Sequence, residues 1–470
     1  MRFNSIEYAA FLPIVFGLYW SLRKSLRWQN VLLLVASYVF YGAWDYRFLS
    51  LLILSTVTDY FVGLRLAASE DQRTRRASLG VSLIVNLGIL AFFKYFNFFI
   101  DSARALLGDI GFVPNPPLLE IVLPLGLSFY TFQTMSYTFD IFRGRMKPTH
   151  SLLNFAVYVA FFPQLVAGPI ERARRFLPQI ESPRSVSRGD IRSGLALILL
   201  GLFKKVAIAD VMAPIVNHVF ARSSTAGTAT LLVGVYAFSL QIYGDFSGYT
   251  DIARGSARLF GMDLIENFRQ PYLSRNITEF WRTWHISLSN WLRDYLYIPL
   301  GGNRNGKLKT YRNIMITMLL GGLWHGAGWT FVVWGGLHGL YLALHRRFRR
   351  RATDEPGIWL LRDLGRTLVT FNLVSFTWIF FRAESLTQAV DYLTGILGRR
   401  GEGVLESQIA LLLLAYLSIV TIDLLQRNTG RELFFLSWRP SARGFVYALL
   451  VVSLIVFSSG QQTPFIYFQF

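Results

Sequence analysis

QIALLLLAYLSIVTIDLL, residues 408 to 425, is the stretch that decides the fold. Asp423 is its one charged residue, and every other position is apolar or uncharged. As a helix it would be about 27 Å long, close to the ~30 Å hydrocarbon core of a bilayer. A segment of this length and composition predicts a helix that crosses a membrane.

Ten further apolar runs recur along the chain, and together they define the expected architecture. They lie at 5–22, 30–44, 48–64, 78–100, 118–142, 194–220, 229–249, 327–345, 367–381 and 444–460. We therefore predict an all-α, polytopic integral membrane protein with about 10–11 transmembrane helices. No internal repeat and no low-complexity linker interrupts the pattern, so we expect a single membrane domain over residues 1–470.

The composition of the whole chain agrees with a membrane protein. Of 470 residues, 53% are hydrophobic and only 16% are charged, where soluble domains carry about 25% charged residues. The net charge is +19 and there is no cysteine, which excludes disulfides, thiolate metal sites and a cysteine-linked acyl intermediate. The basic residues lie in short loops between apolar runs, which indicates a cytoplasmic membrane face rather than nucleic-acid binding.

Basic residues also set the expected sidedness. Only Arg2 precedes the first run and no cleavage site follows it, so we expect a retained segment rather than a signal peptide. The stretch 345–351 is interpreted as a cytoplasmic anchor against anionic lipid heads. The loops predicted to be cytoplasmic contain Arg23, Lys24 and Arg27, and Arg65, Arg73, Arg75 and Arg76. With these loops on the cytoplasmic side, both termini are predicted to lie on the outer side.

The segment 151–169 is the exception among the apolar runs. Basic residues flank it on both sides, and its interior contains Pro163, Gln164, Gly168 and Pro169. These residues would break a helix and expose backbone groups that lipid cannot satisfy. We predict a re-entrant or protein-buried segment, with a kinked full span as the alternative.

His325 is the first candidate for chemistry. It follows the short apolar segment 313–323, and counting from Arg312 places it at a depth of about 20 Å, near the middle of the bilayer. Glycines at 321, 322, 326 and 328 remove side chains around it, which indicates a hollow beside the ring. A buried neutral imidazole can accept a proton from a hydroxyl nucleophile, as acyl transfer requires. The alternative is a core histidine hydrogen-bonded to a neighbouring helix.

His285 is the second candidate. In 280–302, FWRTWHISLSNWLRDYLYIPLGG, large apolar residues recur at helical spacing, which predicts an interfacial amphipathic helix with its tryptophans at the membrane boundary. His285 borders the apolar stripe, and the alternative role is a simple membrane anchor. The residues of the stripe are Trp281, Trp284, Leu288, Trp291, Leu292 and Tyr295.

The remaining polar candidates give weaker signals. His338 and His345 share a helix face and are interpreted as packing and snorkelling residues, and no histidine pair has metal-ligand spacing, so no metal site is predicted. Asp59, Asp245 and Asp251 fall in or beside apolar runs, where an acid is costly unless paired. For Asp245 we favour an ion pair with an arginine over a role in orienting a histidine.

Seven ordered blocks of sequence resemble the membrane-bound O-acyltransferases. Within that family they are most similar to the bacterial branch of the alginate O-acetyltransferase membrane subunit and the teichoic-acid D-alanyl transferase. The resemblance covers nearly the whole chain, and Gly244 is its one departure, since a bulkier residue is more usual there. The blocks are LPLGLSFYTFQTMSY (123–137), FFPQLVAGPIER (161–172), DFSGYTDIA (245–253), ENFRQPYLSRNITEFWRTWHISLSNWLRDYLYIPLGGNR (266–304), GGLWHGAGWTFVVWGGLHG (321–339), WIFFRAES (378–385) and PFIYFQF (464–470).

The resemblance implies a function and a site. It implies that His325 is catalytic, that His285 is a second essential or supporting residue, and that two funnels meet near His325 inside a ring of helices. It further implies an enzyme of the bacterial inner membrane that moves an acetyl group from cytoplasmic acetyl-CoA for O-acetylation of an exopolysaccharide. The implied partners are membrane lipid, the donor, an acetylesterase-like periplasmic or membrane-anchored protein and the polysaccharide, with no bound cofactor.

Two other functions remain open at this point. One is a D-alanyl transferase fed by a carrier protein, although the chain length and the long C-terminal portion favour the acetyltransferase type. The other is a transporter that passes a solute without a covalent step, for which matched broken helices in two halves would be expected and are not found.

Overall fold

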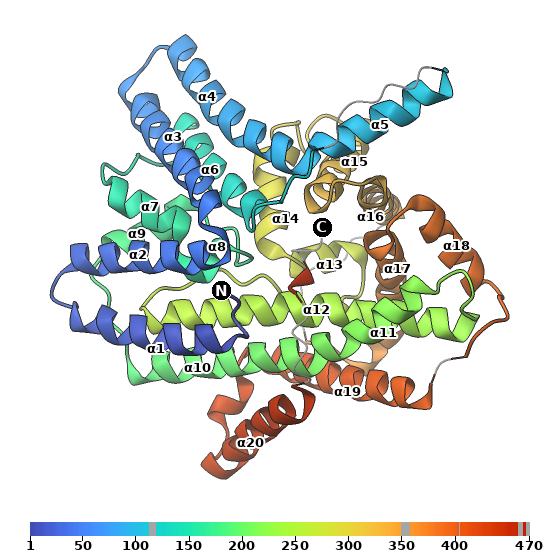
Figure 1. Cartoon of the computed structure of the whole chain (residues 1–470). Coiled ribbons are helices and arrows are strands. Elements are labelled where there is room, and N and C mark those ends of the chain that lie inside the picture. Colours follow the sequence, from blue (N-terminus) through green and yellow to red (C-terminus); the bar gives the residue numbers. More distant parts are fainter. Residues whose placement is uncertain (112–118, 349–357, 404, 459–463, 467–470) are drawn as a thin grey trace. The chain divides into compact units, whose positions relative to one another are not determined.

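The computed structural model describes residues 1–470 except 112–118, 349–357, 404, 459–463 and 467–470 (Figure 1). Within the described residues every regular element is a helix, and the only β contact is an isolated bridge between Ala226 and Glu402. This confirms the all-α prediction. Six helical stretches are long and apolar enough to span a membrane, and they confirm a polytopic membrane protein: Leu26–Ala68, Gln72–Gly108, Thr228–Leu259, Leu361–Arg382, Glu406–Thr429 and Pro440–Phe457.

The chain groups into two compact units, and the predicted single domain stays a prediction. The first unit comprises Met1–Ile191 and Ser256–Ile265, and the second comprises Arg192–Gly255 and Glu266–Phe470. The helices of the first unit are α1 (Ile6–Ser21), α2 (Leu26–Asp45), α3 (Leu49–Ala68), α4 (Gln72–Leu90), α5 (Phe96–Asp109), α6 (Leu127–Phe142), α7 (Leu152–Ala160), α8 (Phe162–Leu165) and α9 (Ala173–Glu181), with a π-helical turn, Ala91–Tyr95, between α4 and α5.

Polar side chains pair with one another inside the first unit. The buried Asp59 of α3 accepts a hydrogen bond of 2.8 Å from the Asn86 amide of α4. The Ser55 hydroxyl donates to the Asn86 side-chain oxygen at 2.7 Å. Asp59, which the sequence analysis expected to need a partner, is therefore hydrogen-bonded to an amide rather than paired with a cation.

The segment 151–169 is broken, as predicted. The helix α7 ends before Phe161, α8 forms a single turn, and residues 166–172 are not helical. Every residue from Phe155 to Glu171 is buried. These observations confirm a protein-buried segment and contradict the alternative of a kinked full span. The predicted run 118–142 began too early, because α6 starts only at Leu127 and no helix covers 119–126.

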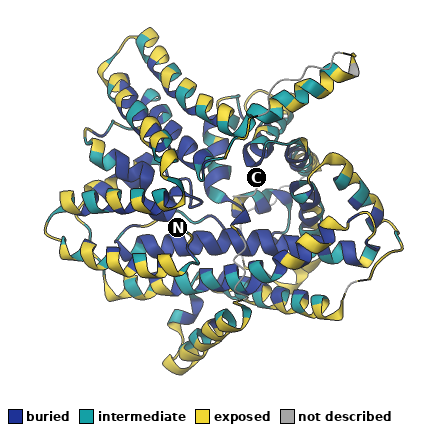
Figure 2. Ribbon diagram, in the orientation of Figure 1, coloured by how far each residue is buried: buried dark blue, intermediate teal, exposed yellow. Residues whose placement is uncertain are grey.

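The second unit is built around residues 228–255 of α12 (Thr228–Leu259), a helix that is buried along most of its length (Figure 2). Its Gly248 meets Gly201 of α10, where an added Cβ on Gly248 would lie 2.6 Å from the Gly201 carbonyl oxygen. Small residues therefore let these helices approach closely. The other helices are α10 (Arg188–Leu202), α11 (Asp210–Ala221), α13 (Ile277–Thr283), α14 (Ile286–Leu292), α15 (Lys307–His325), α16 (Trp329–Phe348), α17 (Leu364–Arg382), α18 (Leu386–Ile396), α19 (Glu406–Thr429) and α20 (Pro440–Phe457).

The predicted amphipathic helix around His285 is wrong. The chain leaves helical geometry at Trp284 and His285, between α13 and α14, and a π-helical stretch, Arg293–Tyr297, follows α14. Trp284 is 1% exposed and Trp291 6% exposed, so these two rings pack inside the protein. Because the stripe is split at His285, its members do not share one membrane-facing surface.

Candidate active site

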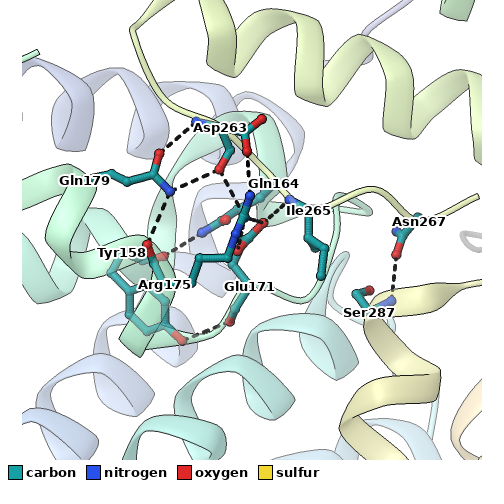
Figure 3. Close-up of polar contacts among 9 residues, drawn as sticks. All are labelled: Tyr158, Gln164, Glu171, Arg175, Gln179, Asp263, Ile265, Asn267 and Ser287. Atoms are coloured by element: carbon teal, nitrogen blue, oxygen red, sulfur yellow. Dashed lines mark hydrogen bonds and ion pairs between the residues drawn. The ribbon is translucent and has the colours of Figure 1, made fainter. Parts of the chain in front are cut away.

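His285 lies in the short connection between α13 and α14. Its backbone has a φ of 43°, a left-handed conformation that is uncommon for a residue other than glycine. Asn267 holds the turn, because its carbonyl oxygen accepts from the Ile286 N–H at 2.9 Å and its side-chain oxygen accepts from the Ser287 N–H at 3.2 Å (Figure 3). Backbone strain of this kind persists where the surroundings over-determine it, and it is common at functional sites.

The environment of His285 keeps its ring uncharged. The side chain is fully buried, and the Phe246 ring of α12 lies edge-on to it with the ring centroids 4.7 Å apart. Burial lowers the pKa of His285 to about 3. The imidazole is therefore neutral at physiological pH, the form in which one ring nitrogen carries a proton and the other a lone pair.

His325 is the last residue of α15, and α16 begins four residues later. The two helices lie side by side (Figure 1) and approach through Gly322 and Gly335, because an added Cβ at Gly322 would lie 2.2 Å from the Phe331 carbonyl oxygen. The His325 side chain is 3% exposed. The tight helix pair thus fixes the end of α15, and with it the histidine.

The structure brings the two predicted histidines together. The ring centroids of His285 and His325 are 6.0 Å apart, although the residues are 40 positions apart in the sequence. Aromatic rings surround the pair, with Trp334 at 5.1 Å and Phe381 at 5.5 Å from the His325 centroid. Trp324 contacts both imidazoles, at 5.9 Å from His285 and 5.1 Å from His325. Two imidazoles in an apolar cage form a site suited to proton transfer.

The glycines near His325 do not line a hollow in the way the sequence analysis expected. A Cβ at Gly326 would lie 2.2 Å from the Phe331 ring, and one at Gly321 would lie 3.1 Å from the Leu292 side chain. The absent side chains therefore make room for Phe331 of α16 and for Leu292 of α14. Close backbone approach, the other effect expected of these glycines, is what Gly322 provides.

His338 is more than the packing and snorkelling residue that its sequence setting indicated. It is fully buried, and its Nε2 lies 2.9 Å from the Thr377 hydroxyl of α17. Its ring centroid is 4.8 Å from that of Trp334, which in turn contacts His325. The sequence signal that could have revealed this is the spacing of Trp334 and His338, which puts both on one face of a helix.

The acids of α12 pair with lysines of a π-helical stretch, Phe203–Ala209, between α10 and α11. The Lys205 ammonium lies 2.8 Å from Asp245, and the Lys204 ammonium lies 2.7 Å from Asp251. Asp245 also accepts a hydrogen bond of 2.6 Å from the Ile466 N–H. The ion pair favoured for Asp245 is therefore present, but its partner is a lysine and not an arginine.

A polar cavity of about 420 Å³ adjoins the segment that holds His285. Three arginines, two glutamines and two glutamates line it together with Ile358 and Gly430. The N–H of Arg269 donates to the Thr283 carbonyl oxygen at 2.9 Å, two residues before His285. Each of its arginines is already paired with a glutamate, Arg254 with Glu432, Arg269 with Glu266 and Arg427 with Glu279. Its arginines are Arg254, Arg269 and Arg427, and its other polar residues are Glu266, Gln270, Gln426 and Glu432.

Glu171 and Arg175 of the 171–192 segment are engaged with each other and with residues of the first unit. The Arg175 guanidinium lies 3.0 Å from Glu171 and 2.6 Å from Asp263, and the Gln179 amide donates to the Asp263 carbonyl oxygen (Figure 3). Burial raises the pKa of Glu171 to about 7, although Arg175 and the Ile265 N–H oppose the rise. Among the described residues, no group of three or more His, Cys, Asp or Glu side chains is arranged to hold a metal ion.

Comparison with known proteins places this arrangement in a family. The chain is 40% identical to the probable alginate O-acetylase AlgI of Pseudomonas putida, over 98% of each chain. It is 37% identical to the peptidoglycan O-acetyltransferase of Helicobacter pylori, over 83% of this chain and 79% of that one. It is also 28% identical to the teichoic acid D-alanyltransferase of Bacillus subtilis, over 58% of this chain and 71% of that one.

The family assignment rests on a match of the chain itself. Residues 38–358, which include His285, His325 and all the helices between α3 and α16, match the model of an acyltransferase family. The match spans well over half of the chain, and the protein therefore belongs to the membrane-bound O-acyltransferase family.

Proposed function

We propose that this enzyme transfers an acetyl group from cytoplasmic acetyl-CoA, across the bacterial inner membrane, for O-acetylation of an exopolysaccharide. The observation that carries the proposal is the pair of buried imidazoles, 6.0 Å apart, in an aromatic cage. The relatives named as an alginate O-acetylase and a peptidoglycan O-acetyltransferase support acetyl transfer to a polysaccharide hydroxyl.

In the proposed reaction His325 is the general base. Its imidazole takes the proton of an acceptor hydroxyl as the hydroxyl oxygen attacks the thioester carbonyl carbon. The tetrahedral intermediate collapses with cleavage of the C–S bond, and the thiolate leaves with a proton returned by the imidazolium. His285, neutral and held by its strained turn, lies close enough to position His325 or the acceptor.

The donor is proposed to enter from the cytoplasmic side. The segment that lines the 420 Å³ cavity also supports the turn at His285, and donor phosphates bound there would compete with the glutamates that pair with its arginines. Basic residues of the 302–312 segment, in the same unit as the cavity, would add a positive potential that attracts the donor. The acceptor is a hydroxyl of an acetylesterase-like periplasmic or membrane-anchored partner, which completes transfer to the polymer.

Purified enzyme supplied with acetyl-CoA labelled in the acetyl group tests the proposal directly. We expect label to move to the partner protein or to the polysaccharide, and the His325→Ala variant to abolish that transfer while its abundance stays normal. Exposed His218→Gln on α11 is the matched control and should transfer label at the wild-type rate.

The outcomes separate the proposal from other functions. Transfer of D-alanine from a carrier protein, with no transfer from acetyl-CoA, would show that the proposed donor is wrong. It would leave the proposed acyl-transfer chemistry in place. Flux of an unmodified solute that survives His325→Ala would contradict the enzymatic proposal as a whole.

A further inference from the structure

Three side chains of the second unit form a cluster beside His325 that the proposed chemistry leaves unused. Trp281 of α13 and Trp334 and His338 of α16 contact one another, with centroid separations of 5.8 Å, 5.1 Å and 4.8 Å. We call them the Trp–His cluster. Trp334 is shared with the cage around His325, so the cluster adjoins the reacting histidine.

The hydrogen bond of His338 fixes its tautomer. The Thr377 hydroxyl has one proton, and it donates that proton to the Val374 carbonyl oxygen at 2.7 Å. With the hydroxyl proton assigned to that oxygen, Nε2 of His338, 2.9 Å from the same hydroxyl, is assigned as the donor. A neutral imidazole protonated on Nε2 has its lone pair on Nδ1. The cluster thus contains one strong acceptor nitrogen.

The cluster also contains two donors. The indole N–H groups of Trp281 and Trp334 and the Nδ1 of His338 are buried, and none has a hydrogen-bond partner among the residues that the structure describes. Buried polar atoms in native proteins nearly always have partners, and exceptions gather at functional sites. Two donors and one acceptor on mutually contacting rings match a ligand group with a carbonyl oxygen and an N–H, which is an amide.

The position of the cluster selects the donor as the source of that amide. His338 lies seven residues, or about 10 Å along the helix, before His345, where α16 begins its basic last turn. Basic helix ends face the cytoplasm. His338 therefore lies between the cytoplasmic end of α16 and Trp334, whose ring contacts His325, on the course that a cytoplasmic donor would take.

We infer that the Trp–His cluster binds an amide group in the arm of the acyl donor and so sets the depth to which the thioester enters. Trp281 and Trp334 would donate to the amide oxygen, and His338 Nδ1 would accept from the amide N–H. This inference rests on the proposed function, because it takes the ligand to be a thioester donor. It makes Trp281 and His338 determinants of donor specificity.

Two small thioesters test the inference by binding. The acetyl thioester of N-acetylcysteamine carries one amide, and the acetyl thioester of 1-pentanethiol, of matched chain length, carries none. We expect wild-type enzyme to bind the amide probe more tightly than the pentyl probe. The Kd of the pentyl probe divided by that of the amide probe measures this preference, and it should fall about three- to tenfold in Trp281→Phe and in Trp334→Phe, because each loses one hydrogen bond. Both variants keep the ring and remove only the N–H. His338→Phe should lose the preference as well, and Trp438→Phe, outside the cluster, should keep it.

Each result decides the matter. Equal ratios in the wild type, Trp281→Phe and Trp334→Phe, or no binding of either probe to the wild type, would overturn the inference and leave the cluster as packing. A preference that the Phe variants lose, in an enzyme that transfers acetyl from no thioester, would support the binding site and contradict the proposed function. If His338→Phe fails to fold, the two tryptophan variants still give the answer.

Discussion

Two buried polar groups of this protein are treated in opposite ways. In the first unit, Glu171 is surrounded by charge and hydrogen-bond donors, with Arg175 at 3.0 Å and the Ile265 N–H bound to the same carboxylate (Figure 3). In the second unit, His285 and His325 are surrounded by aromatic rings. A paired carboxylate holds chain segments together, whereas a neutral imidazole in an aromatic cage forms no such pair. In the proposed function the first is a structural site and the second a chemical one.

The largest effect is expected for the chemical site. His325→Ala should lower the transfer rate by about 10²–10⁴, the usual contribution of a general base. If His285 acts on the same reacting atoms, the double variant should be no slower than His325→Ala alone. Initial rates of label transfer measure both. If the rate reduction in the double variant equals the product of the two single reductions, the two imidazoles act independently. They would then not form a single two-histidine site.

Gly322 sharpens the comparison by testing how firmly the chemical site is held. Gly322→Ala places a Cβ 2.2 Å from the Phe331 carbonyl oxygen, which is backbone and cannot move away cheaply. We expect a loss of about 1–3 kcal/mol in stability, from overpacking, together with lower activity. Gly80→Ala on α4, where nothing lies within 4 Å, is the control and should be neutral or slightly stabilising. Thermal unfolding in detergent distinguishes the two, and equal melting temperatures would contradict the prediction.

A smaller effect is expected from backbone strain at His285. Because its φ is 43°, His285→Gly relieves strain that His285→Ala retains, and the glycine variant should be the more stable by about 1 kcal/mol. Inside a regular helix an alanine variant is more stable than a glycine variant, so a more stable glycine variant at position 285 would be specific to the left-handed turn. Both variants lack the imidazole and should be inactive. A glycine variant less stable than the alanine variant would show that the turn is not strained.

The sequence was sufficient to predict an all-α membrane fold and to select two histidines that the structure brings together, while their roles stay a prediction. Both predictions use one local rule, that hydrocarbon tolerates apolar side chains and selects against polar ones. The break at His285 could not be predicted, because no glycine or proline marks it and the turn depends on Asn267, 18 residues earlier. The bond between His338 and Thr377 joins residues 39 apart, and only tertiary packing makes it visible.

The partners of the α12 acids were predicted only in kind. Local composition showed that Asp245 needed a cation, and arginine was the more numerous choice in the loops. The lysines were overlooked because they lie inside an apolar run, where the π-helical stretch Phe203–Ala209 turns both toward α12. Irregular helical turns of this kind often occur at functional positions, and they have no simple sequence pattern.

The smallest effect concerns the structural site and its dependence on pH. Burial raises the pKa of Glu171 to about 7, above its value of about 4.5 in the unfolded chain, so the folded protein binds this proton more tightly. The resulting stabilisation is fully present below pH 4.5 and is lost as the pH rises through 7. Glu171→Gln cannot titrate, so the melting temperature of the wild type, relative to this variant, should fall between pH 5 and pH 8. In Arg175→Gln this fall in melting temperature should occur at higher pH than in the wild type, because the substitution removes the cation that stabilises the carboxylate. If the difference in melting temperature between the wild type and Glu171→Gln stays constant from pH 5 to pH 8, Glu171 has an ordinary pKa despite its burial. Arg175 and the Ile265 N–H would then fully offset the cost of burying the carboxylate charge.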